Sequence, residues 1–324
     1  MQQVEEIQRN LAAAGYIADT DLASIIHLTH VLQRPLLLEG DAGVGKTAVA
    51  VALSQMMQQD LIRLQCYEGL DASTALYEWN YQRQLMAVRL RENELRENEL
   101  RENELRENDL RENAPQEKNT RGEIKSNADT IESELFSKEY LLPRPLLQAI
   151  TTPEPCVLLI DEIDRADDEF EAFLLEVLSD FQITIPELGT IKALHRPTVL
   201  LTSNATRDLS DALRRRCLFH FVDFPDAKKE LNILSTQLPD LDLHLARSIA
   251  RFVQKLRQES LKKTPGVAET LDWAAALMHL QTGELEQSLP QIEATLGCLL
   301  KTQADRELAT SGWLQQLLNP ASDS

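Results

Sequence analysis

A glycine-rich octapeptide at residues 40–47 constrains the fold of this chain more than any other feature of its sequence. Gly-Asp-Ala-Gly-Val-Gly-Lys-Thr fits the pattern G-x-x-x-x-G-K-[ST], and it follows an apolar run and precedes a helical pattern at 46–58. A turn of this kind presents backbone N–H groups to a small concavity, where phosphate oxygens find several donors. The sequence therefore predicts a phosphate-binding loop between a strand and a helix.

The side chains of the octapeptide have separate expected roles toward a nucleotide. The Lys46 ammonium is expected to meet the β- and γ-phosphates, and the Thr47 hydroxyl is expected to bind Mg²⁺. A glycine-rich turn without a ligand is the alternative, and the flanking strand and helix argue against it. The residues expected to bind the phosphates are Gly40, Asp41, Ala42, Gly43, Val44, Gly45, Lys46 and Thr47.

Two later apolar runs also end in polar residues. The run at 156–160 is followed by Asp161 and Glu162, and the run at 197–202 leads to Asn204. Ligands bind at the carboxyl edge of open α/β sheets, so Asp161 is expected to hold Mg²⁺ and Glu162 to deprotonate the attacking water. If the two strands are neighbours, Asn204 lies beside Glu162 and helps to fix that water. A strand-end turn without a function is the alternative for Asn204.

Three consecutive arginines, Arg214, Arg215 and Arg216, follow a short helical segment in an otherwise acidic chain. An exposed guanidinium beside the γ-phosphate of a neighbouring subunit stabilises the charge of the transition state. A surface basic cluster or a set of salt bridges is the alternative interpretation.

The spacing of apolar residues divides the chain into an α/β part and a helical part. Further strands are expected at 61–66, 156–160, 197–202 and 218–222. Helices among them are expected at 4–13, 21–32, 72–88, 140–150 and 167–179. This alternation predicts a parallel sheet with crossover helices over residues 1–225. Only helices are expected in a second domain at 226–324, at 227–237, 241–258, 268–281, 290–300 and 304–317.

A five-residue repeat, Leu-Arg-Glu-Asn-Glu, interrupts the first domain at 90–113. Five residues advance a helix by about 140° beyond one turn, so the leucines wind around its surface and form no coiled-coil seam. The repeat is expected to be a solvated helix or a partly disordered insertion, and a contact with a specific partner is the alternative. Residues 114–133 are expected to be a flexible return to the domain.

The overall charge limits the classes of partner that this chain is expected to bind. The chain has 324 residues, with 33 Lys and Arg against 52 Asp and Glu, which gives a net charge of −19. This acidity argues against a surface built for DNA, RNA or anionic lipid, although it is compatible with a local basic pore loop. No secretory signal and no apolar run of about 20 residues is present, so a cytosolic protein without a membrane segment is expected.

The cysteines form no CxxC pair, and buried thiols are expected at Cys66, Cys156, Cys217 and Cys298.

Taken together, these motifs resemble those of AAA+ ATPases, most closely the MoxR family. The phosphate loop, the Asp-Glu strand, the Asn strand end, the arginine segment and the C-terminal helices follow the family's order across essentially the whole chain outside the insertion. Other segments look like the branch that includes the CoxD-type ATPases, and these are residues 65–71, 76–81, 83–85, 145–149 and 265–273.

The resemblance implies ATP and Mg²⁺ as cofactors and a hexameric ring with an active site at each subunit boundary. It implies that Asn204 senses the γ-phosphate and that the arginine finger acts in trans, with Arg216 favoured and Arg215 second. Tyr16 and Ile17 match the family's adenine-side segment.

The resemblance also concerns two segments farther along the chain. Residues 181–194 match a β-hairpin that family members often use on the ring surface or in the pore. The sequence departs from the family at 264–280, which contain no arginine to serve as a second sensor of the γ-phosphate. Glu269 or Thr270 occupies the corresponding region.

Three functions are therefore compared. The leading one is a ring-forming, Mg²⁺-dependent ATPase that remodels or matures a protein client, as a chaperone that inserts a metal or activates an enzyme. The resemblance implies a partner with a von Willebrand factor A domain for this function. A nucleic-acid-directed motor or restriction-type NTPase is the second, and the net charge disfavours it. A weakly hydrolysing ATP-binding switch or scaffold is the third, and the intact Lys46, Asp161, Glu162 and Asn204 disfavour it.

Overall fold

The structure, a computed structural model, describes residues 1–109 and 135–319, which form two compact units. The first unit comprises residues 1–69 and 154–171 and the described chain from 196 onward. The second comprises the described parts of 70–153 and 172–195. Across these described residues, no helix combines the length and apolar character that crossing a membrane requires.

A five-stranded parallel sheet organises the first unit, in the order β2-β5-β8-β1-β9. The bounds of its strands are β1 Leu36–Glu39, β2 Asp60–Gln65, β5 Cys156–Asp161, β8 Thr198–Ser203 and β9 Leu218–Phe221. Central strands of a parallel sheet are covered on both faces, and β5 is buried throughout while β8 is buried from Val199. The predicted parallel sheet is confirmed, and β5 and β8 are neighbours, with Leu159 opposite Leu200.

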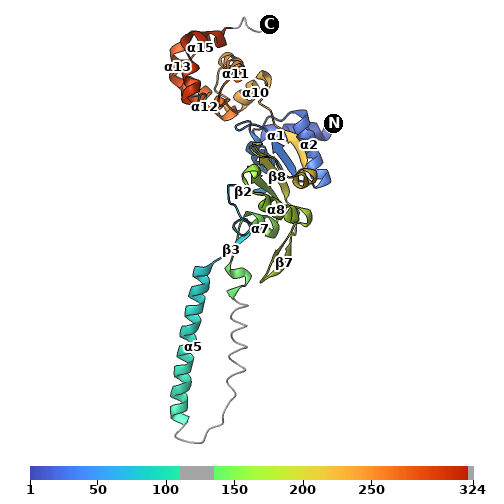
Figure 1. The fold of residues 1–324 in the computed structure, drawn as a ribbon, viewed down its shortest axis with the longest axis vertical. Coiled ribbons are helices and arrows are strands. Elements are labelled where there is room, and N and C mark those ends of the chain that lie inside the picture. The colour runs from blue at the N-terminus through green and yellow to red at the C-terminus, as the bar shows by residue number, and fades with distance from the viewer. Residues whose placement is uncertain (110–134, 320–324) are drawn as a thin grey trace. The chain divides into compact units, whose positions relative to one another are not determined.

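Three helices share a core with one face of this sheet. They are α1 Gln2–Ala13, α2 Thr20–Leu32 and α3 Lys46–Met57. Leu36 and Leu38 of β1 alternate with Leu37, so both point to the same face and join this core with Val157 and Leu159 of β5. Figure 1 shows α1 and α2 beside the sheet. The helices contribute Leu11, Leu22, Ile26, Val49, Ala50 and Leu53 to the core.

The C-terminal helices have a core of their own, centred on Trp273 and Phe252, whose ring centroids are 5.0 Å apart. The predicted single helix at 304–317 was wrong, because Thr310 begins a new helix by accepting the Trp313 N–H at 3.3 Å. The helices are α10 Ala227–Gln237, α11 Leu243–Gln258, α12 Val267–His279, α13 Leu289–Thr295, α14 Gln303–Leu308 and α15 Ser311–Leu318.

Two predicted helices of the second unit were wrong in part. The predicted helix at 72–88 is interrupted by β3 Tyr77–Trp79, which pairs antiparallel with β4 Leu141–Pro143 inside the predicted helix at 140–150. Trp79 is buried and lies edge-to-face against Phe136, a tertiary contact that local spacing does not show. The helices that do form are α4 Ala72–Leu76, α5 Tyr81–Asp109 and α7 Pro145–Thr151.

The repeat and the hairpin also lie in the second unit. Helix α5 runs without interruption through the repeat to Asp109 (Figure 1), and Leu90 on it is exposed. The rest of the repeat and the predicted flexible return at 114–133 lie outside the described residues. The predicted hairpin is confirmed as β6 Gln182–Ile185 paired with β7 Gly189–Lys192. Helix α8 Asp168–Asp180 belongs to the first unit up to Glu171 and to the second unit from Ala172.

A buried ion pair ties the C-terminal helices to the end of the α/β part. Both guanidinium ends of Arg257 in α11 bond the carboxylate of Glu230 in α10, and the two side chains are 6% and 1% exposed. The same guanidinium donates to the Pro265 carbonyl at 2.9 Å and lies 4.9 Å from the centroid of the Phe224 ring. Because a charge removed from water must be compensated, this cluster holds α10, α11 and the segments around them together.

Breaking this pair is expected to destabilise the fold. Glu230→Gln leaves the Arg257 charge buried without its counter-charge, so the free energy of unfolding should fall by about 3 kcal/mol or more in denaturant titrations. The matched control is Asp211→Asn, which removes an exposed pair with Arg215 at 3.7 Å and should change stability by less than about 1 kcal/mol. Equal effects of the two substitutions would contradict the prediction.

Candidate nucleotide-binding site

The glycine-rich loop leaves the carboxyl end of β1 in a conformation that other residues do not fit. A Cβ on Gly40 would lie 2.2 Å from the carbonyl oxygen of Val222, so no larger residue fits at this point. Gly45 has a φ of 98° and directly precedes the first turn of α3. The sequence therefore places a helix N-terminus, with its unpaired N–H groups, directly after the loop.

Lys46 connects this loop to the neighbouring strand β8. Its side chain is only 6% exposed, and Nζ donates to the carbonyls of Gly40 at 2.6 Å and Asp41 at 2.7 Å. The third bond goes to Oδ1 of Asn204 at 2.8 Å. Burial lowers the pKa of Lys46, and the charges of Asp164 and other nearby carboxylates oppose this shift. Two residues that the sequence assigned to the γ-phosphate thus lie in direct contact.

Asp161 and Thr47 meet at the same edge, as their positions in the sequence predicted. The Thr47 hydroxyl donates to the Asp161 carboxylate at 3.2 Å, and the Asp161 side chain is 3% exposed. Hydroxyl and carboxylate oxygens are the donors that Mg²⁺ prefers, so this pair fits that ion. The Thr202 hydroxyl and the Arg63 guanidinium also bond Asp161, and sequence reasoning found neither of them.

Glu162 takes an uncommon backbone conformation where β5 ends. Its φ of 56° lies in the left-handed region, which costs about 1–2 kcal/mol for a residue with a Cβ and recurs at functional sites. Its N–H donates to the Thr202 hydroxyl at 2.9 Å, and its carboxylate pairs with Nε of Arg165 at 2.9 Å. The side chain is partly exposed, so water reaches the carboxylate.

The adenine-side segment lines an apolar pocket beside the loop. The ring of Tyr16 lies 3.8 Å from the position of a Cβ on Gly45, and burial raises the pKa of Tyr16. Gln237 of α10 donates to the Gly15 carbonyl at 2.8 Å, so the C-terminal helices help to hold this segment. The apolar side chains that line the pocket are Tyr16, Ile17, Val44, Ala48, Pro225, Ile233, Val267 and Leu271.

The start of α12 touches the phosphate loop through backbone atoms. The Val267 N–H donates to the Gly43 carbonyl at 2.9 Å, and a Cβ on Gly266 would lie 2.7 Å from Gly43. Glu269 and Thr270, which stand where the related family carries its second sensor, both bond Gly266 instead. In this chain the C-terminal helices therefore meet the loop by close glycine packing.

The three arginines of α9 Asp211–Arg216 have different surroundings. Arg214 pairs with Glu39, the last residue of β1, at 2.8 Å. Arg215 is 83% exposed, and Arg216 is exposed as well. Arg34 at the start of β1 donates to the carbonyls of Arg216 at 3.1 Å and of Cys217 at 3.2 Å. The end of α9 is thus fixed, while Arg215 and Arg216 face outward.

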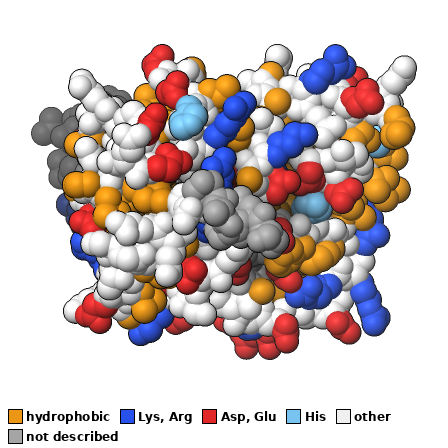
Figure 2. Space-filling model, turned by 90° about the horizontal axis from the view of Figure 1, so that it is seen from above, with side chains coloured by type: hydrophobic (Ala, Val, Ile, Leu, Met, Phe, Trp, Pro, Cys, Tyr) orange, Lys and Arg blue, Asp and Glu red, His pale blue; other side chains and the backbone are white. Residues whose placement is uncertain are grey.

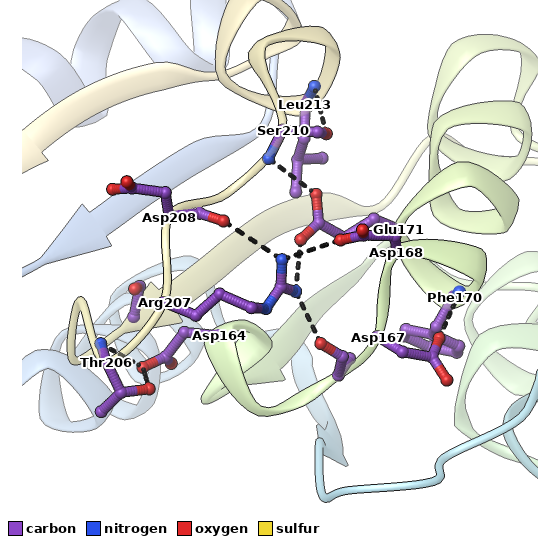
Figure 3. Close-up of polar contacts among 12 residues, drawn as sticks. Asp164, Asp167, Asp168, Phe170, Glu171, Thr206, Arg207, Asp208, Ser210 and Leu213 are labelled. Atoms are coloured by element: carbon purple, nitrogen blue, oxygen red, sulfur yellow. Dashed lines mark hydrogen bonds and ion pairs between the residues drawn. The ribbon is translucent and has the colours of Figure 1, made fainter.

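A second polar network, shown in Figure 3, lies beside the strand ends. Asp164 accepts the N–H and the hydroxyl of Thr206 at 3.0 and 2.6 Å, and these hydrogen bonds lower its pKa against the effect of burial. Arg207 pairs with the buried Glu171 at 2.5 Å. Sequence reasoning missed all of these residues. The one available signal was Glu171, a charge on the apolar face of α8 with Leu174.

This geometry is that of a P-loop nucleotide-binding fold, with a parallel sheet flanked by helices and a helical C-terminal region. Residues 35–217 match the family described as AAA domain (dynein-related subfamily). The chain belongs to this family and is therefore an AAA+ ATPase. The four cysteines are free thiols, and Cys298 is only partly buried, against the prediction, while the other three are buried. The Cys66 N–H donates to the Asp161 carbonyl at 2.8 Å, so this residue lies beside the site.

The chain is also similar to solved structures. A RuvB mutant from Thermotoga maritima is 15% identical, with 92% of this chain and 72% of that chain covered and a TM-score of 0.47. The RuvB Holliday junction branch migration motor from Thermotoga maritima is 15% identical, with 90% and 68% covered and a TM-score of 0.43. None of the curated proteins compared with the chain matches it.

The glycine contact between α12 and the loop gives a prediction for nucleotide affinity. A methyl group at Gly266 must push α12 away from Gly43, so Gly266→Ala should weaken ATP binding about tenfold or more, measured by calorimetry. Gly297→Ala is the control, because a Cβ there meets nothing within 4 Å, and its affinity should stay within twofold of wild type. Unchanged affinity in Gly266→Ala would show that the loop tolerates the displacement.

Proposed function

We propose that this ATPase binds Mg²⁺ and works as a ring whose subunits share their active sites. The observation that carries the proposal is the meeting of Lys46 with Asn204, and of Thr47 with Asp161, at one edge of the sheet. Thr47 and Asp161 would hold the ion, which when bound neutralises charge on the β- and γ-phosphates. Backbone N–H groups of residues 40–47 would bind the phosphate oxygens.

Glu162 is the proposed general base. Its partly exposed carboxylate would accept a proton from the water that attacks the γ-phosphate. Asn204 would contact the γ-phosphate and help to orient that water, while Lys46 would stabilise the charge on the phosphate oxygens. Tyr16 and Ile17 would meet the base in the apolar pocket that they line.

The proposed ring supplies its arginine finger from the neighbouring subunit. Arg214 is partly buried and pairs with Glu39, whereas Arg215, which pairs with the exposed Asp211, and Arg216 are exposed at the end of a fixed helix. A guanidinium in this position suits charge stabilisation in trans, with Arg216 as the first candidate and Arg215 as the second. We propose a hexamer, as the resemblance to the MoxR family implies.

The biological role that we propose is a MoxR-type chaperone that remodels or matures a protein client in the cytosol. It would act with a partner that carries a von Willebrand factor A domain, in a metal insertion or an enzyme activation. The β6-β7 hairpin and the exposed start of α5 are surface elements of the kind that such contacts use. We also retain the proposed boundary between an AAA+ domain at 1–225 and a helical lid at 226–324, which the separate core around Trp273 supports.

Neither the net charge of −19 nor the face shown in Figure 2 favours the nucleic-acid alternative. On the face shown in Figure 2, outside the grey atoms, acidic and basic side chains are interspersed with apolar ones. A protein that neutralises several phosphates needs grouped Lys and Arg side chains.

Replacing the proposed base tests the mechanism. Glu162→Gln removes the proton acceptor and keeps the size of the side chain, so turnover should fall by about 10²–10³ while ATP affinity stays near wild type. Phosphate release and calorimetry measure the two quantities. Glu169→Gln, an exposed carboxylate close by in the sequence, is the control and should hydrolyse ATP normally. Normal turnover in Glu162→Gln would remove this residue from the mechanism and favour another base.

Mixing two inactive variants tests the shared site. Arg216→Ala subunits keep their own base, and Glu162→Gln subunits keep their arginine, so mixed rings contain some complete sites. ATP hydrolysis should therefore rise above that of either variant alone, with a ring mass of about six subunits by light scattering in the presence of ATP. No recovery at any mixing ratio, together with a monomeric mass, would instead favour the ATP-binding switch.

A further inference from the structure

We propose that Glu171 is a positioning residue that fixes α9 to the loop following Asn204, so that Arg215 and Arg216 project toward the next subunit. The proposal deepens the proposed function, because it rests on an arginine finger that acts in trans. It assigns a role to a buried carboxylate that neither binds the phosphates nor activates water in the mechanism described above.

The two oxygens of Glu171 bond two different segments (Figure 3). Oε1 pairs with Nη2 of Arg207 at 2.5 Å, and Oε2 accepts the N–H of Ser210 at 2.9 Å. The carboxylate is 1% exposed, whereas the Arg207 side chain that pairs with it is 31% exposed, so the carboxylate itself is removed from water. A single buried carboxylate from α8 therefore joins the loop at 204–208 to the residue that begins α9.

Ser210 carries this connection into α9. It is the N-cap of the helix, and its Oγ accepts the Leu213 N–H at 3.3 Å. The helix extends only from Asp211 to Arg216, so fewer than two turns separate the anchored residue from Arg216. Because a short helix moves as a rigid body, a shift at Ser210 is passed to both exposed arginines.

Arg207 connects Glu171 to the loop that follows Asn204, beside the phosphate loop. Its Nη1 donates to Asp168 at 3.1 Å and its Nη2 to the Ala166 carbonyl at 2.6 Å, so the guanidinium is held from several directions. Three residues earlier, Asn204 accepts the bond from Lys46 at 2.8 Å. A continuous path of bonds thus runs from the phosphate loop through Asn204 and Arg207 to the start of α9.

Two atoms in this network lack a hydrogen-bond partner. Among the residues that the structure describes, Oδ1 of Asp164 and Nε of Arg207 are buried and unpaired. Buried polar groups are normally satisfied, so these two atoms show that the network is not arranged to satisfy every polar group.

The first test compares substitutions of two residues that contact the same guanidinium, that of Arg207. Glu171→Gln keeps an oxygen for the Ser210 N–H but removes the charge that holds Arg207, so kcat should fall about tenfold while ATP affinity stays within twofold. Asp168→Asn is the matched control, because Asp168 is 92% exposed and binds the same Arg207, and its kcat should stay at the wild-type value. Equal kcat values in both variants and wild type would overturn the proposal.

Mixed rings separate positioning of the finger from an effect within the same site. In an excess of Glu162→Gln subunits, most Glu171→Gln subunits receive an arginine from an unaltered α9, so turnover per Glu171→Gln subunit should return toward wild type. Low turnover at every ratio, while Arg216→Ala subunits recover in the same assay, would overturn the inference and leave the proposed function intact. If neither variant recovers, the result contradicts the hypothesis of an arginine finger that acts in trans, and it contradicts this inference as well.

A second variant covers the case in which Glu171→Gln does not assemble, as judged by thermal unfolding and ring mass. Ser210→Ala leaves the carboxylate in place and removes only the cap of α9, so it should lower kcat and recover in the same mixing assay. A loss of turnover in Ser210→Ala that persists in mixed rings would place the defect in the variant's own site and contradict the proposal.

Discussion

Parallel pairing of β1, β8 and β5 is the constraint on which the rest of this molecule depends. Parallel strands end at the same edge of a sheet, so the polar residues that follow them are brought together wherever they stand in the chain. Gly40, Asp161 and Asn204 are separated by more than forty positions from one another, yet Lys46 reaches Asn204 and Thr47 reaches Asp161. The chemistry of the site follows from this shared edge and from the burial of the strands that form it.

Buried charges hold neighbouring elements of the structure together. Asp161 is paired with Arg63 of β2, Glu171 of α8 with Arg207, and Glu230 of α10 with Arg257 of α11. In each pair at least one side chain is almost fully buried, so the partners hold each other in place at the cost of desolvation. These pairs fix the relative orientation of elements, which the interactions within each element do not determine.

Local sequence predicted some elements and failed for others for a recognisable reason. The strands at 156–161 and 198–203 are nearly continuous apolar runs, which is the pattern of a sheet covered on both faces. The helix expected at 72–88 contains β3 instead, because Trp79 gains more from burial and from pairing with Leu141 than from helical spacing. Arg63 and Glu171 were missed because the order of residues along the chain does not show which distant residue a charged side chain will pair with.

The sequence by itself determined the phosphate loop, the acids after β5, the asparagine after β8 and the division into an α/β part and a helical part. Backbone conformation and apolar periodicity are local properties, so they can be read from neighbouring residues. Only the tertiary structure decided that Lys46 meets Asn204, that Gly266 packs against Gly43 and that Glu171 joins Arg207 to Ser210. These contacts depend on the order of strands and on which charges share a buried space, and both arise only when distant segments pack together.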